Sequence, residues 1–331
     1  MFIGVEGREA LPRRKGLDMI VEKDIKFRRL IPIIWRRMLI MFILSASIVL
    51  PLVYFDLKQF MIGMTTPLIL GTAISIFLGF RTNSAYDRWF SGRDLFGQLC
   101  ASTRNLALIL SRVNDQYIDI ETNKKSDKAA KVMPRMIRRA IAFVWMAGEQ
   151  LKDGKPLEFE NIETLLSAKE IAELESAHNP ALALLFRQRS DFREAMKQHQ
   201  LYDGEHFEFV AIHRQLVETL TACESLKNTP FPTHYTYFTD LFVWLLVILL
   251  SLSLPANESS GYYAIPLAVL IGWIFSMIEG IGDYMDYPWR HNRNVVPMEF
   301  MSRNLEIDLK ALALGETDLP IPFGPKDGAI Y

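Results

Sequence analysis

Cysteine is scarce in this sequence, and neither sign of charge is in excess. Only Cys100 and Cys223 occur among the 331 residues, which excludes a disulfide-rich secreted scaffold. Lys and Arg total 37 against 38 Asp and Glu, so the net charge of −1 gives no reason to expect a nucleic acid partner. The signatures HExxH, P-loop and G-x-S-x-G are missing, as is the alternating pattern of β-strands. The sequence therefore disfavours an enzyme and a β-rich fold.

Four long runs without charge are present instead. They occupy residues 38–55, 61–80, 241–257 and 261–278 and contain no Asp, Glu, Lys or Arg. A helix that spans a membrane needs about 20 mostly apolar residues. One such run fits a buried core helix, but four runs in two pairs predict an all-α membrane protein with four transmembrane helices. The first run is not expected to be a signal peptide, because it begins far from Met1 and no small-residue cleavage site follows it.

The basic residues near these runs lie at one end of each pair. Residues 1–37 hold ten Lys and Arg, and the connectors within the two pairs carry only Lys58. The basic residues that follow the second and fourth runs are Arg81, Arg88, Arg93, Arg290 and Arg293. Because basic loops stay in the cytoplasm, we expect an integral protein of the cell (inner) membrane with both termini cytoplasmic. The predicted segments are cytosolic residues 1–37, transmembrane residues 38–80, cytosolic residues 81–236, transmembrane residues 237–280 and cytosolic residues 281–331.

The region between the two pairs of runs is predicted to be helical. Residues 94–113 and 135–151 place apolar side chains at spacings of three and four. Residues 181–199 and 205–226 are two further helices, and residues 158–175 form one or two short ones. These segments predict a cytosolic helical bundle. No proline interrupts residues 80–97, so we expect the second transmembrane helix to continue into the cytosol as one long helix.

The second run carries a stripe of side chains that suits a pore lining. Thr72, Ile76 and Phe80 recur every four residues and fall within an arc of about 80° on a helix. The residues around them are small and permit close helix packing, namely Gly71, Ala73, Ser75 and Gly79. Packed and lipid-facing helices show the same spacing, so the spacing alone leaves both interpretations open.

Two sets of ionisable residues are candidates for a metal site. Glu279, Asp283 and Asp286 follow the fourth run at spacings of four and three, which places them on one helix face. They are candidates for a cation site, for pairing with cytoplasmic arginines, or for charge balance beside the membrane. A second set, with a spacing of seven, is His199, His206 and His213. For these histidines a solvated helical face is the plainer interpretation.

Three motifs lie close together in residues 70–97, namely I-F-L-G-F-R, N-x-A-Y-x-R-W and G-R-x-L-x-G. Residues 223–236 contain C-E-S-L, then T-P-F-P and Y-T, and residues 282–289 read G-D-Y-M-D-Y-P-W. In these motifs, and in the order of the four runs, the chain resembles the bestrophin family, particularly its bacterial and fungal members. The likeness covers residues from about 20 to 312.

This resemblance implies a homopentameric, all-helical ion channel with one central pore. The second membrane helix lines a narrow neck in that family, and the neck positions fall here on Thr72, Ile76 and Phe80. A lower cytosolic constriction falls on Leu184, soon after Asn179-Pro180. The partners implied are further copies of the chain, the lipid bilayer and small inorganic ions, expected to be anions such as chloride.

The resemblance does not extend to calcium binding. Animal members hold calcium through an acidic run after the last span, and Tyr284, Met285 and Tyr287 interrupt that run here. We therefore expect no cofactor and no calcium activation.

The residues of the predicted neck suit a gate for physical reasons. Water leaves a narrow apolar ring readily, and an ion must shed its hydration to cross one. The positive edges of Phe80 rings would favour anions, whereas the ring faces would favour cations. Residues 61–80 contain no Asp or Glu, and Arg81 follows them. There its side chain attracts anions, extends toward the membrane surface or pairs with Asp87.

Other functions remain open on the sequence alone. A secondary carrier of a small solute needs polar or ionisable groups in the middle of the membrane. The runs offer only hydroxyls there, such as Thr65, Thr66, Thr72 and Ser75. A non-conducting membrane scaffold would use the helical bundle to bind a partner. A membrane enzyme is the least favoured, since no catalytic group of residues is evident.

Overall fold

The computed structural model of the chain describes residues 19–20, 31–116, 118–119, 124–125, 129–199, 203–256, 261–289, 296–323 and 329–330. Several residues used to predict the orientation lie outside these ranges, among them Arg28, Arg29, Arg290, Arg293 and the link 258–260.

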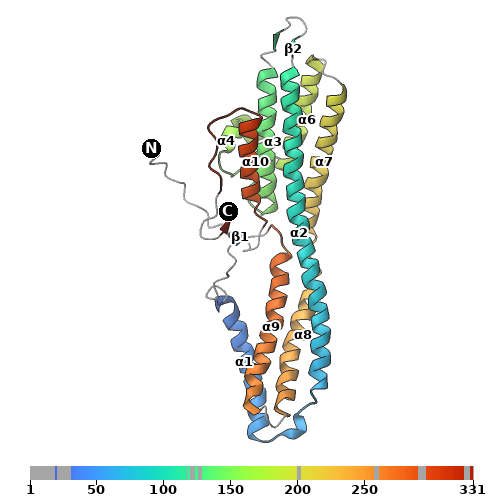
Figure 1. Cartoon of the computed structure of the whole chain (residues 1–331), viewed down its shortest axis with the longest axis vertical. Helices are drawn as coiled ribbons and strands as arrows, with labels where there is room; N and C mark the ends of the chain where they lie inside the picture. The colour runs from blue at the N-terminus through green and yellow to red at the C-terminus, as the bar shows by residue number, and fades with distance from the viewer. Residues whose placement is uncertain are drawn as a thin grey trace, which may run out of the picture. The chain divides into compact units, whose positions relative to one another are not determined.

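The described chain is helical apart from two pairs of very short strands (Figure 1). The α-helices are α1 Ile31–Tyr54, α2 Thr65–Gln116, α3 Ala129–Leu151, α4 Ile162–Leu165, α5 Ala168–Glu175, α6 Pro180–His199, α7 Asp203–Asn228, α8 Thr233–Ser253, α9 Ala264–Met285 and α10 Met298–Leu312. Short 3-10 turns are η2 Lys58–Phe60, η3 Leu254–Ala256 and η4 Gly261–Tyr263. Strand β1 Met19–Ile20 pairs antiparallel with β4 Ala329–Ile330, and β2 Ile118–Asp119 pairs antiparallel with β3 Lys124–Lys125. The predicted all-α class is confirmed.

The helices form two compact units. The membrane unit comprises Glu22–Asp94 and Glu224–Pro288, and the bundle unit comprises Met1–Val21, Leu95–Cys223 and Trp289–Tyr331. The predicted segment boundaries at residues 80 and 236 follow the uncharged runs. The membrane unit reaches beyond both of them, since it extends along α2 to Asp94 and its second part begins at Glu224, near the end of α7.

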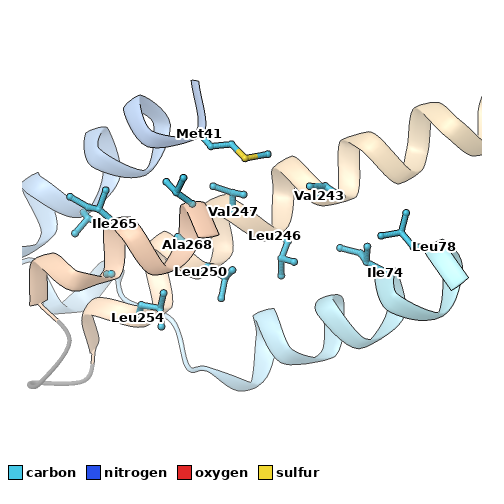
Figure 2. Close-up of a cluster of buried hydrophobic side chains, with 13 residues drawn as sticks. Met41, Ile74, Leu78, Val243, Leu246, Val247, Leu250, Leu254, Ile265 and Ala268 are labelled. Atoms are coloured by element: carbon cyan, nitrogen blue, oxygen red, sulfur yellow. The ribbon is translucent and has the colours of Figure 1, made fainter. Parts of the chain in front are cut away.

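The membrane unit holds four helices that are long and apolar enough to cross a membrane. In it α1, α8 and α9 pack against one another in pairs. Helix α2 joins this core through Ile74 and Leu78, which point at α8 near Val243 and Leu246 (Figure 2). These apolar contacts leave the opposite face of α2 uncovered.

Close packing of α9 depends on a glycine. A Cβ atom placed on Gly272 would lie 2.4 Å from Cγ2 of Val247 and 3.2 Å from Sδ of Met41. Both neighbours are fully buried, so neither side chain has room to yield. Helices α1, α8 and α9 therefore approach one another at a position where only hydrogen fits.

We expect Gly272→Ala to destabilise the membrane unit by roughly 1–3 kcal/mol, the usual cost of overpacking a core. The measurement is the thermal unfolding midpoint of the detergent-solubilised protein. Gly280→Ala is a matched control on the same helix, since nothing lies within 4 Å of a Cβ there. Equal midpoints for the two variants would show that the contact at Gly272 is not tight.

Helix α2 is the longest element and contributes to both units. Its 52 residues at 1.5 Å each extend about 78 Å, far more than the roughly 30 Å of a bilayer's hydrocarbon. The single helix predicted across residues 80–97 is therefore confirmed.

The bundle unit is built around α3, which packs against α4, α6 and α10. One of its buried ion pairs joins Arg139 to Glu170 of α5 at 2.5 Å, and Arg139 also contacts Asp191 of α6 at 2.5 Å. The predicted helices 94–113, 135–151, 181–199 and 205–226 all occur, as parts of α2, α3, α6 and α7. Residues 158–175 form the two short helices α4 and α5.

His213 lies inside a stack of aromatic rings in the bundle unit. Its ring lies 4.1 Å from that of Phe209, which in turn stacks on Phe192 at 3.5 Å. Burial lowers the pKa of His213 to about 4; the carbonyl of Phe209 opposes this shift and the Arg189 guanidinium adds to it. The stack explains why the seven-residue spacing of histidines does not mark a solvated face at this position. Among the described residues no group of His, Cys, Asp and Glu is arranged to hold a metal.

The buried imidazole makes the stability of the bundle unit depend on pH. The folded pKa of His213 is lowered below the unfolded value, so its contribution is complete above about pH 6.5 and is lost as the pH falls toward 4. The total loss is roughly 3 kcal/mol for a shift of this size. We expect His213→Leu to reduce the difference between unfolding midpoints at pH 7.5 and pH 5. The exposed His178→Leu is the control and should leave that difference unchanged.

Candidate functional site

The uncovered face of α2 carries the three residues of the predicted neck. Ile76 is 56% exposed and Phe80 69% exposed, and Thr72 is also in the exposed class. On the other side, Ile74 and Leu78 are each 1% exposed against α8. At 100° per residue the two sets lie about 180° apart around the helix. The described chain therefore turns the predicted neck residues away from its own core.

This face is uncharged, and its hydroxyls are already engaged. The hydroxyl of Thr72 donates to the carbonyl of Leu68 at 2.9 Å, and that of Ser75 donates to the carbonyl of Gly71 at 2.8 Å. Each hydroxyl proton is thus used within the helix, and the side chains present mainly carbon to the outside. Such a surface offers a passing ion little to replace its water.

Arg81, directly after this face, does not share its exposure. Its side chain is 3% exposed and lies against α9, where Nη2 bonds Asp283 and Nη1 lies 3.6 Å from Oε1 of Glu279. Asp87 instead accepts a hydrogen bond from Asn83 at 3.3 Å. The structure therefore corrects two of the roles predicted for Arg81, because it is neither exposed to attract anions nor paired with Asp87.

The acidic residues after the fourth run bind arginines. Glu279 is 2% exposed and accepts a hydrogen bond from Arg37 of α1 at 2.9 Å, in addition to its contact with Arg81. Arg37 also bonds Asp240 of α8. Asp286 contacts Nε of Arg88 at 2.9 Å, and burial raises its pKa while Arg88 opposes that shift. Of the alternatives drawn from the sequence, this arrangement matches pairing with arginines, and the partners are Arg37, Arg81 and Arg88.

An open groove of the membrane unit, with a volume of about 550 Å³, is lined by Arg37 and by the carboxylates of Asp240, Glu279, Asp283 and Asp286. Aromatic residues share its lining, and the guanidinium of Arg37 lies 5.7 Å from the ring centre of Trp244. No group suited to a metal ion was found among the described residues, here or elsewhere. The carboxylates of this groove are therefore arranged to neutralise arginines of α1 and α2.

Leu184 does not occupy the position that a constriction needs. It is 0% exposed and lies in α6, which packs against α3 of the same chain. A side chain that narrows a shared pore must face outward from its own protomer, so the burial of Leu184 does not match its predicted role. Leu185 is equally buried at 1%, whereas Phe186 is 66% exposed.

The chain matches known proteins along most of its length. Residues 24–311 match the family model described as Bacterial/Fungal Bestrophin protein. The chain belongs to the bacterial/fungal bestrophin family. Among bestrophin relatives, the voltage-dependent anion channel-forming protein YneE of Salmonella typhimurium is 25% identical over 291 residues, 87% of this chain and 88% of that protein. The voltage-dependent anion channel-forming protein alr2987 of Nostoc sp. is 29% identical over 282 residues, 79% of this chain and 86% of that protein.

The bestrophin fold is shared with solved structures as well. A bacterial bestrophin homologue from Klebsiella pneumoniae superposes with a TM-score of 0.74 at 22% identity, covering 85% of this chain and 98% of that one. The family and the all-helical fold implied by the motifs in residues 70–97 are therefore confirmed.

Proposed function

We propose that this bestrophin is an anion channel whose pore neck is lined by Thr72, Ile76 and Phe80 of α2. The observation that carries the proposal is the uncovered and uncharged face of α2, which lies opposite the face that packs on α8. The names of the relatives in Salmonella and Nostoc, which are anion channel-forming proteins, support the choice of ion. Chloride is the anion we expect to pass.

One chain cannot enclose a pore with a single helix face, so the proposal requires several copies. We propose a homopentamer in which the five α2 helices surround a common axis. The membrane unit then lies in the cell (inner) membrane, with the bundle unit and both termini in the cytoplasm. No cofactor is required, because arginines neutralise Glu279, Asp283 and Asp286 in place of a cation.

The neck would control flow by the cost of removing water from ions. Rings of Ile76 and Phe80 provide no charge and no hydrogen bond donor to compensate an ion for lost hydration. Phe80 rings that turn their edges to the axis would present partial positive charge to an anion. Conduction then requires the ring to widen or the phenyl groups to turn.

A secondary carrier is less favoured by the same observations. Alternating access needs ionisable groups in the middle of the membrane. Among the described membrane helices, the charged side chains lie outside the four uncharged runs, and Arg37, Arg81 and Glu279 are paired there. A scaffold without transport is the remaining alternative, and it predicts no current.

The test is the reversal potential of purified protein in a planar bilayer with a tenfold KCl gradient. An anion channel gives a reversal potential displaced toward the chloride equilibrium potential. A reversal potential displaced toward the potassium equilibrium potential would overturn the choice of ion. A protein that passes no current in any preparation would support the scaffold.

A further inference from the structure

The uncovered face of α2 continues beyond Phe80 and changes from apolar to acidic. Asp87 is exposed and lies seven residues after Phe80, so it points within about 20° of the same direction, roughly 10 Å further along the helix. The side chain of Asp87 also points within about 20° of the direction of Ile76. Asn83, one turn before Asp87, is exposed and donates a hydrogen bond to it at 3.3 Å. Asp87 therefore belongs to the stripe that begins at Thr72.

No basic residue of α2 in the membrane unit offsets this carboxylate on the same face. Viewed down the helix, Arg81 points about 100° and Arg88 about 80° away from Phe80, toward their partners on α9 and in the segment after it. Arg93 lies on a third side, about 140° from Phe80. Asp94 adds a second acidic residue within about 40° of Phe80.

We propose that Asp87 is a selectivity-determining residue, which forms an acidic ring just past the neck and limits the preference of the pore for anions. The inference rests on the proposed function, since the side chains form a ring only if α2 lines the pore. A ring of like charges in a confined passage concentrates cations and repels anions. The neck would then set how easily ions cross, and the acidic ring would set the ratio in which anions and cations reach it.

Two variants should change the permeability ratio in opposite directions if the acidic ring exists. Asp87→Asn removes the charge with almost no change of shape, and we expect the chloride-to-potassium permeability ratio to rise roughly three- to tenfold. Asn83→Asp adds a carboxylate on the same face one turn nearer the neck, and we expect the ratio to fall by a similar factor. Two variants with opposite signs distinguish an electrostatic role from damage to the helix.

The effect of these charges on the permeability ratio should also depend on the salt concentration. The Debye length is about 30 Å at 10 mM and about 3 Å at 1 M. Reversal potentials of the wild type and both variants should therefore differ in gradients near 10 mM and converge in gradients near 1 M. Asp56→Asn is the control, because it removes the same charge from the exposed α1–α2 connector, where Asp56 has a positive φ of 49° that Asn tolerates.

Four outcomes separate this inference from the proposed function. Opposite shifts in the two variants that vanish at high salt, with Asp56→Asn unchanged, support the acidic ring. An unchanged ratio in both variants, while Ile76→Ala raises the flux, overturns the ring and leaves the neck standing. No change in any of the three variants overturns both. If Asp87→Asn does not fold, Asn83→Asp alone decides, and an unaltered ratio in it counts against the ring.

Discussion

Replacing Phe80 or Ile76 with alanine is expected to raise the chloride flux of the reconstituted protein by roughly tenfold, which corresponds to a barrier lower by about 1.4 kcal/mol. Both side chains are more than half exposed on the face of α2 that its own chain leaves uncovered. Alanine at either position widens the proposed ring and lets water remain in it, so an ion keeps more of its hydration. The measurement is chloride efflux from liposomes at equal protein content.

The control for these variants is Ile43→Ala on α1. Ile43 is 59% exposed and apolar, so it matches Ile76 in character but does not lie on α2. Its replacement should leave the flux at the wild-type level. If both Ile76→Ala and Phe80→Ala show wild-type flux, the neck does not lie on this face of α2.

The second large effect is a loss of folding stability, which we expect for Arg81→Met. Arg81 is 3% exposed and contacts Glu279, which is 2% exposed, so the change leaves a buried carboxylate with fewer compensating charges. We expect a loss of about 3 kcal/mol of stability, at the lower end of the range for broken buried pairs because Arg37 still bonds Glu279. The thermal unfolding midpoint in detergent measures it.

Two comparisons show whether this loss belongs to the buried pair. Arg104→Met removes an arginine that is 40% exposed and bonds the half-exposed Asp308, for which about 1 kcal/mol or less is expected. The double variant Arg81→Met with Glu279→Met should lose less than the sum of its single changes, because no unpaired charge stays buried. A midpoint for Arg81→Met equal to that of Arg104→Met would contradict the burial of the pair.

The sequence predicted most clearly those features that depend on local pattern. The four uncharged runs and the long helix α2 needed only length, hydropathy and the absence of proline in residues 80–97. Helix α10 was not predicted, although Met298, Leu305 and Leu309 repeat at helical spacing. Its buried face also contains Arg303, Glu306 and Lys310, so charged residues conceal the apolar stripe that marks most helices.

The candidate site was predictable in its residues but not in its pairing. Spacings of four and three placed Glu279, Asp283 and Asp286 on one face, yet their burial differs, with Asp283 54% exposed. The hydrogen bond between Arg37 and Glu279 joins residues 242 positions apart, and no local pattern specifies such a contact. The burial of Leu184 likewise depends on which side of α6 meets α3, and the position of Asn179-Pro180 gives no information about that side.

The most direct test of the pore is the accessibility of single cysteines on α2 to a charged thiol reagent during current recording. The native Cys100 and Cys223 are 3% and 0% exposed, so the wild type should not respond. We predict that the reagent blocks most of the current through Ile76→Cys and leaves Leu78→Cys, which faces α8, unaffected. Current through Ile76→Cys that is as insensitive as current through Leu78→Cys would mean that this face of α2 does not line the pathway of the ions.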